Sequence, residues 1–325
     1  MNIFKVLLII SSFLVFSIVF LFSGKKEEKE DEFVIWKHDF TALSYSYSGG
    51  GNACPGFLES SFTVKRLPHS LREQPVFSIT DSQGFVYEAG YLTKNLLKEL
   101  AVLRSDTSLA DTEKNRLEFH IQDKCPIVKL HKTNKETVTI FLGRLSRDKS
   151  FRYILADKKI TRLPAYTLDR FKRKLREFRN PSFISLKGYE FESLKYSENT
   201  KFLADFKYLA NRKSKFWLNN KTDKPLSPPH SSKLSGFILS LSIDKYADEI
   251  SIIHSLSSEQ SRLEIQLTNG DFYSISIYKS ILIDSVEYSP LQIKLEGKLQ
   301  QSPAFIQKNR IEELRDLLQL IIKGK

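Results

Sequence analysis

Apolar side chains recur along most of the chain at two spacings, either every second residue or every third to fourth residue. The period-two pattern lies on both sides of Thr133-Asn134 and on both sides of Asn269-Gly270. A polar turn between two alternating runs is typical of a β-hairpin, and Asn-Gly is its strongest short-range form. The pattern therefore predicts one antiparallel hairpin over residues 128–142 and a second over residues 263–277.

The helical spacing follows a strand in three segments that start at Gly84, Lys159 and Lys298. Each segment begins as a strand, turns at a small residue and continues as an amphipathic helix. A repeated strand–hairpin–strand–helix unit would explain this similarity, whereas unrelated amphipathic helices share such spacings by chance. When the segments are placed in register, the small residues at the three turns are Gly90, Ala165 and Ala304.

The middle segment runs from Lys158 to Arg179 and is rich in lysine and arginine. Phe171, Leu175 and Phe178 fall at positions i, i+4 and i+7, which places them on one face of a helix. We therefore expect a basic amphipathic helix that ends before Pro181, because proline disfavours a helical conformation in the residue before it. Its bases form a candidate docking surface or a solvated face: Arg170, Lys172, Arg173, Lys174, Arg176 and Arg179.

These elements predict an α+β fold in which an N-terminal transmembrane helix precedes repeated antiparallel hairpin and strand–helix units. The expected organisation is a membrane anchor over residues 1–24, a charged linker over 25–32, a first α+β unit over 33–180 and a second, related unit over 181–325. A chain of 325 residues is long enough for one large domain or two smaller ones.

The segment from Val6 to Gly24 contains no charged residue and predicts the anchor. At about 1.5 Å per residue it forms a helix about 28 Å long, close to the thickness of a bilayer core. A cleaved signal peptide and a buried helix are the alternatives. The apolar run exceeds the usual length of a signal peptide and ends in Phe22-Ser23-Gly24, where phenylalanine is bulky.

The orientation of the anchor follows from two opposing features. The lysines at 25, 26 and 29 would place the C-terminal side in the cytoplasm if bases alone are counted. A very short head before a long apolar run is nevertheless the usual design of an anchor that exports its C-terminal domain. We therefore expect a single-pass protein of the inner membrane with its folded part outside the cytoplasm.

The only two cysteines, Cys54 and Cys125, are the candidates for one disulfide bond. An even, minimal count in an exported domain is typical of such a bond, and two unrelated buried thiols are the alternative. A loop of about 70 residues would be closed, which stabilises a fold by about 4 kcal/mol in the chain-entropy model.

The net charge of +12 permits binding to nucleic acid, anionic lipid or acidic glycans. The bases are spread along the chain, and the aromatic residues between them occupy the apolar-face positions of the expected elements. We therefore expect no nucleic-acid partner. Among the histidines and cysteines we find no spacing typical of a metal site, and no nucleophile or phosphate-loop motif is present. The sequence predicts no metal, cofactor or small-molecule substrate.

Residues 140–186 carry a Leu142-Gly143 turn, an aromatic strand at 151–155, a short strand at 160–163 and the Arg179-Asn180-Pro181 exit. A tryptophan strand at 214–220 is followed by a proline-containing loop and a helix. In these features the chain resembles the bacterial DUF4340 domain family of unknown function. The resemblance implies a membrane anchor, duplicated strand–helix units and a non-enzymatic accessory role beside ABC-type or gliding-motility-type transport systems. The Gly49–Gly56 loop departs from the family pattern.

The sequence thus predicts a non-enzymatic, membrane-anchored envelope protein that docks onto subunits of an ABC-type transport complex. Two alternatives stay open. One is an enzyme that processes envelope glycan or peptide, and the other is a basic adaptor that binds anionic polymer.

Overall fold

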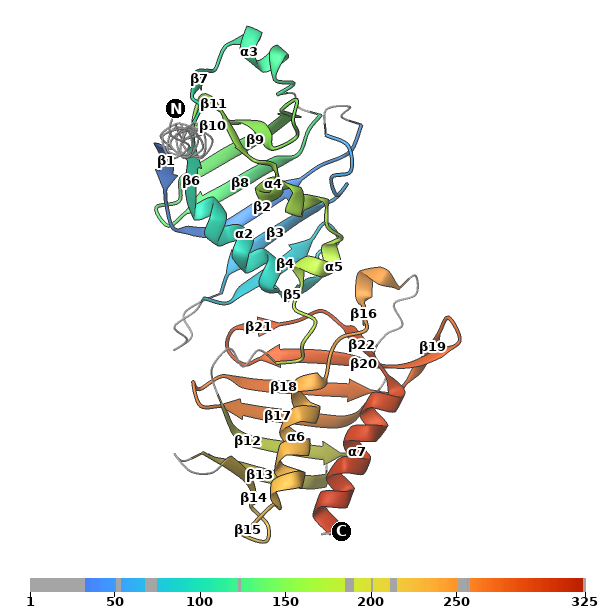
Figure 1. Cartoon of the computed structure of the whole chain (residues 1–325). Coiled ribbons are helices and arrows are strands. Elements are labelled where there is room, and N and C mark those ends of the chain that lie inside the picture. Colours follow the sequence, from blue (N-terminus) through green and yellow to red (C-terminus); the bar gives the residue numbers. More distant parts are fainter. Residues whose placement is uncertain are drawn as a thin grey trace, which may run out of the picture.

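Two antiparallel sheets, each with helices on one face, build this α+β protein (Figure 1). The computed structural model describes residues 33–50, 54–67, 75–121, 124–184, 190–199, 201–210, 215–250, 256 and 258–323. The predicted anchor and charged linker lie outside these residues. Within the described ranges, no helix is both long enough and apolar enough to span a bilayer.

The first sheet has nine strands in the described part of the chain, in the order β5-β4-β3-β2-β8-β9-β10-β11-β7. Neighbouring strands run antiparallel throughout. The predicted hairpin over 128–142 is confirmed, because Lys129 lies opposite Thr139 in the β8–β9 ladder. The strands are β2(Phe40–Ser46), β3(Ser61–Arg66), β4(Phe77–Asp81), β5(Val86–Glu88), β7(Leu109–Ala110), β8(Ile127–Lys132), β9(Thr137–Leu145), β10(Phe151–Ala156) and β11(Lys159–Pro164), with a separate ribbon of β1(Phe33–Lys37) and β6(Val102–Ser105).

Short helices cover one face of the first sheet, and none of the described helices lies on the opposite face (Figure 1). Helix α2 buries Leu96, Leu97 and Leu100, which share one face of its amphipathic pattern. Aromatic rings complete this core: the rings of Tyr45 and Phe171 stack with their centroids 4.8 Å apart. The helices of this unit are α2(Tyr91–Ala101), α3(Glu113–Glu118), α4(Ala165–Asp169), the 3-10 turn η1(Arg170–Lys172) and α5(Leu175–Phe178).

The prediction of one continuous basic helix up to Phe178 is wrong. The helical backbone is interrupted at Arg173 and Lys174, whose ψ angles are 153° and 147°. Helix α5 then begins with its own cap, because the Lys174 N–H donates to the Glu177 carboxylate at 3.1 Å. Phe171 and Phe178 are nevertheless fully buried, so the apolar positions were predicted correctly while the backbone between them differs.

The second sheet follows the order β15-β14-β13-β12-β17-β18-β20-β22-β16, and β19 and β21 also pair with β20. The predicted hairpin over 263–277 is confirmed by the pairing of β17 with β18. Helices α6(Pro228–Ser240) and α7(Lys308–Lys323) cover one face (Figure 1). The strands are β12(Phe191–Glu198), β13(Lys201–Ala210), β14(Lys215–Asn219), β15(Lys224–Pro225), β16(Lys245–Tyr246), β17(Glu259–Leu267), β18(Phe272–Tyr278), β19(Ile281–Ile283), β20(Val286–Leu295), β21(Leu299–Gln300) and β22(Ala304–Gln307), with the 3-10 turn η2(Ala247–Glu249) between β16 and β17.

The three predicted strand–turn–helix segments do not share one register. Helices α2 and α4 begin directly after or at the expected turns, Gly90 and Ala165. Ala304 instead begins strand β22, and helix α7 starts at Lys308. The turn predicted at Ala304 is therefore wrong, and an internal repeat stays a prediction.

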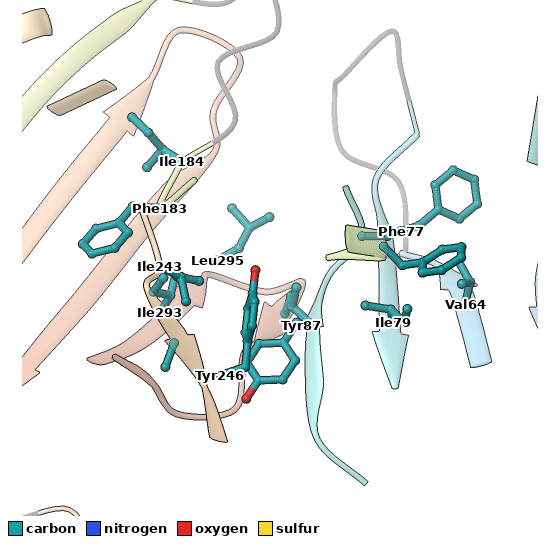
Figure 2. Packing of buried hydrophobic residues seen from close by; sticks show 14 of the residues in the cluster. Val64, Phe77, Ile79, Tyr87, Phe183, Ile184, Ile243, Tyr246, Ile293 and Leu295 are labelled. Atoms are coloured by element: carbon teal, nitrogen blue, oxygen red, sulfur yellow. The ribbon is translucent and has the colours of Figure 1, made fainter. Parts of the chain in front are cut away.

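The two sheets meet edge to edge, where β5 of the first lies beside β21 of the second (Figure 1). Val86 and Ser302 join them through two hydrogen bonds: the Val86 N–H donates to the Ser302 hydroxyl at 2.8 Å, and the Ser302 N–H donates to the Val86 carbonyl at 2.7 Å. Figure 2 shows Tyr87 and Tyr246 side by side in the buried cluster, with Ile79 of the first sheet on one side and Ile293 of the second on the other.

Candidate functional site

The predicted basic surface is largely paired with acids. Lys174 lies at the cap of α5 and is exposed, and Arg179 is buried. The other four bases form ion pairs: Arg170 with Glu99 at 2.5 Å, Lys172 with Asp169 at 2.8 Å, Arg173 with Glu177 at 3.5 Å and Arg176 with Glu249 at 3.4 Å. Paired surface bases attract an additional anion only weakly, because each carboxylate offsets the charge of its partner.

Arg179 was expected on the exposed basic face, and this placement is wrong. Its side chain is only 1% exposed and donates to Asp81 at 2.9 Å and to Asp248 at 2.5 Å. Its guanidinium also lies over the rings of Tyr87 and Tyr246, at 4.5 and 4.7 Å from their centroids. Because Asp81 belongs to the first sheet and Asp248 to the second unit, Arg179 joins the two units and takes no part in a surface.

Cys54 and Cys125 are joined by a disulfide bond with their Cα atoms 5.7 Å apart. Both cysteines are buried, and Arg152 lies beside them with its side chain 1% exposed. Arg152 donates to the Gly143 carbonyl at 2.6 Å and lies over the Phe57 ring at 4.8 Å. Burial lowers the pKa of Arg152, and the nearby Asp169 carboxylate opposes that effect. The cluster is closed to solvent and supports the fold around the disulfide bond.

An open groove of about 770 Å³ lies on the face of the first sheet opposite helices α2, α4 and α5. Strand β2 forms its floor with the small residues Ala42, Ser44 and Ser46. Its walls come from the two neighbouring strands: Ser61, Thr63 and Lys65 on β3, and Lys129 and His131 on β8. Thr80, Asp81 and Ser82 close the side toward β4.

The alternation of each strand explains why this surface is polar. On β2 the side chains of Leu43 and Tyr45 are buried under the helices, so Ala42, Ser44 and Ser46 point to the opposite face. On β3, Phe62 and Val64 are likewise buried, and Ser61, Thr63 and Lys65 are on the groove side. Tyr45 and Phe62 also border the groove, but they contribute only backbone atoms to it, because their rings lie on the opposite face of the sheet.

Two lysines give the groove its charge. Lys65 and Lys129 are exposed, and neither forms an ion pair with any residue in the described ranges. Strand β2 separates them, so their backbones are about 10 Å apart. The one acid in the lining, Asp81, is occupied: its carboxylate accepts from the N–H groups of Gln83 and Phe85, each at 2.9 Å, and from Arg179.

Hydroxyl groups cross the groove floor in a hydrogen-bonded series. The Ser44 hydroxyl lies 3.3 Å from the Thr63 hydroxyl and 3.4 Å from Nε2 of His131. Nδ1 of His131 lies 3.0 Å from the Thr137 hydroxyl. Ser44 and His131 thus have the contact of a nucleophile with a base, and Thr137 occupies the place of the group that orients the base.

The surroundings of Ser44 do not complete a site for acyl transfer. Such chemistry needs N–H donors aimed at a developing oxyanion. Strand β2 lies between β3 and β8, so the N–H groups on either side of Ser44 are used in the two ladders. The partner of His131 is a neutral hydroxyl and not a carboxylate. The arrangement is suited to hydrogen bonding with a ligand and to attraction of negative charge.

Sequence reasoning did not identify the groove residues. The signal was present as alternating small hydroxyl residues at 44, 46, 61 and 63, next to the lysines at 65 and 129. Their assembly depends on the pairing of β2 with β8, which are far apart in the sequence. Among the residues of the described ranges, no group of three or more histidine, cysteine or acidic side chains is placed to hold a metal ion.

Comparison with known proteins gives one result. The family model described as a domain of unknown function (DUF4340) matches residues 91–252. The match spans parts of both units and includes Arg179, Asp248 and two groove residues, Lys129 and His131. No curated protein and no solved structure matches the chain.

Proposed function

The chain belongs to the DUF4340 family, whose description states no function, and from this premise we propose that the protein is a non-enzymatic, membrane-anchored docking protein of the cell envelope. Its binding surface is the open face of the first sheet, and its ligand carries negative charge. The proposal thus joins the predicted docking role to the adaptor alternative.

One observation carries this proposal, namely the groove with two lysines that form no ion pair with any described residue. Lys65 and Lys129 lie on either side of the small residues of β2, and the acid in the groove lining, Asp81, is already paired with Arg179. A concave surface with cations of one sign focuses an electrostatic field and attracts anions. By contrast, most of the bases between Arg170 and Arg176 are paired with carboxylates.

The experiment that tests this surface compares two charge-matched variants of the full-length protein in detergent. Lys65→Gln/Lys129→Gln removes the groove charges. Lys195→Gln/Lys207→Gln removes two exposed lysines of the second sheet that also form no ion pair with a described residue, and it changes the net charge equally. With a soluble polyanion such as polyacrylate as the probe, we expect salt-dependent binding that only the groove variant weakens. Equal weakening by both variants would show non-specific attraction to a basic protein and would refute the proposed surface.

The proposed location depends on the apolar segment Val6–Gly24, which is long enough to span a bilayer. An anchor with so short a head usually places the domain that follows it outside the cytoplasm. We expect the folded part to be cut by protease in spheroplasts and to be protected in intact cells. Protection in spheroplasts that ends only after the inner membrane is broken would place the folded part in the cytoplasm and contradict the proposal.

Subunits of an ABC-type transport complex are the proposed protein partner, on the basis of the family resemblance. Affinity purification from membranes solubilised in mild detergent tests this partner. Enrichment of transporter subunits over a control purification would support it, and their absence after chemical crosslinking would count against it.

A further inference from the structure

We propose that the groove on the first sheet binds a carboxylated polysaccharide. This inference rests on the proposed function, and it adds the chemical class of the ligand at the same surface. Three features of the groove lead to it: its shape, the donor and acceptor properties of its side chains, and the arrangement of its charges.

The groove has the shape of a trough along strand β2. Small side chains form the floor, and the long side chains of Lys65 and Lys129 rise from the flanking strands. From Ala42 to Ser46 the floor measures about 14 Å at about 3.4 Å per residue. An extended chain lies along such a trough more readily than a compact ligand. The volume of about 770 Å³ lies within the usual range of ligand-binding sites.

The uncharged polar side chains of the groove both donate and accept hydrogen bonds. Hydroxyl groups have this double capacity, and a neutral imidazole has one nitrogen of each kind. A ligand that itself carries hydroxyl groups can satisfy both functions, whereas a phosphate chain only accepts. The residues that supply these groups are Ser44, Ser46, Ser61, Thr63, Thr80, Ser82 and His131.

The positions of the lysines require negative charge on the same ligand. Thr63 and Lys129 lie directly opposite Ser44 on its two sides, and Lys65 and His131 lie opposite Ala42. Across β2, one lysine and one neutral polar residue thus flank Ser44, and the same combination flanks Ala42. A sugar that carries a carboxylate beside its hydroxyls matches this alternation of charged and neutral partners.

A single-stranded nucleic acid fits the groove less well. Proteins that bind such strands offer exposed aromatic rings on which the bases stack. Here the rings of Tyr45 and Phe62 are buried on the far side of the sheet, where both stack or pack against phenylalanines of the helical layer. The groove supplies charge and hydrogen bonds without a stacking platform.

The test uses the full-length protein in detergent and three probes of comparable length: oligogalacturonate, its methyl ester and inorganic polyphosphate. The ester keeps the sugar backbone and removes the charge. We expect oligogalacturonate to bind, the ester to bind at least tenfold more weakly, and polyphosphate to bind more weakly than oligogalacturonate at equal charge and salt concentration. Isothermal titration calorimetry measures the three dissociation constants.

Groove variants connect binding to the proposed residues. Lys65→Gln/Lys129→Gln should weaken oligogalacturonate binding at least tenfold, and Ser44→Ala should weaken it about threefold to tenfold, as loss of one hydrogen bond does. The control variant Lys195→Gln/Lys207→Gln should leave it unchanged. Circular dichroism melting curves that match the unmodified protein establish that each variant is folded.

Two results would overturn the inference, and only the second would also refute the proposed function. Groove-dependent binding of polyphosphate without binding of oligogalacturonate refutes the sugar ligand and leaves the anionic docking surface in place. Absence of binding to every anionic probe, or binding that the groove variants do not alter, refutes both the sugar ligand and the proposed function.

Discussion

The substitution Arg179→Met tests how the two sheets are held together. Methionine has a long apolar side chain that can still lie between Tyr87 and Tyr246, but it carries no charge and donates no hydrogen bond. The change therefore removes the ion pairs to Asp81 and Asp248 while it retains much of the packing where the two sheets meet, which we call the joint.

The expected loss follows from the burial of the three charged groups. The side chains of Arg179, Asp81 and Asp248 are 1%, 4% and 18% exposed. Removing one partner of a buried ion pair costs about 3–5 kcal/mol, because the remaining charge is left without compensation. Asp81 keeps two N–H donors, and Asp248 is partly solvated, so we expect the lower end, about 3 kcal/mol.

Urea denaturation of the full-length protein in detergent measures this loss, and Arg170→Met is the matched control. Arg170 also pairs with a carboxylate, Glu99, but the two side chains are 23% and 34% exposed. Pairs near the surface contribute about 1 kcal/mol or less. A further variant, Arg179→Met/Asp248→Asn, should recover part of the loss because it removes one of the two unpaired charges.

One outcome in particular would contradict a stabilising role for the buried ion pairs of Arg179. If Arg179→Met lowers the free energy of unfolding by no more than Arg170→Met does, then the joint does not depend on the buried ion pairs. The double variant adds a second check, since an additive further loss would show that Asp248 stabilises the joint independently of Arg179.

Three further predictions concern other parts of the fold. Reduction of the Cys54–Cys125 bond should lower the free energy of unfolding by about 4 kcal/mol. In urea denaturation, Cys54→Ser should be as stable as the double variant in which both cysteines are replaced by serine. A free energy of unfolding well below that of Cys54→Ser in the double variant would contradict this. Gly90→Ala should destabilise the fold by about 1–3 kcal/mol, because the added Cβ atom would collide with the backbone carbonyl of Arg179. Gly236→Ala places its Cβ atom in open space and should stabilise helix α6 by up to about 1 kcal/mol. Equal melting temperatures for the two variants would contradict this difference. Hydrogen bonds from Arg162 lower the pKa of Asp106, so this pair stabilises the fold above about pH 4 and loses its contribution as the pH falls through the lowered pKa. An NMR titration should show a higher Asp106 pKa in Arg162→Met than in the unmodified protein. An unchanged titration curve would disprove the role of Arg162.

Local pattern predicted several elements of the fold correctly. The hairpins over 128–142 and 263–277 form as expected, because period-two alternation and a polar turn are properties of a few neighbouring residues. The burial of Phe171 and Phe178 also follows from local spacing, although the backbone between them is not one helix. Apolar spacing fixes which side chains face the core, but it does not show where a capping contact such as Lys174 to Glu177 interrupts a helix.

The sequence alone therefore determined the α+β class, the hairpins and the faces of the strands. Only the tertiary structure decided which faces meet and which charges are buried. Arg179 appears in the sequence as one base among many, but its partners Asp81 and Asp248 lie 98 and 69 residues away. The groove likewise requires β2 to pair with β8, which brings His131 within 3.4 Å of Ser44, 87 positions earlier. Periodicity specifies the face on which a residue lies, whereas its neighbours there depend on strand order, which is set by packing over the whole chain.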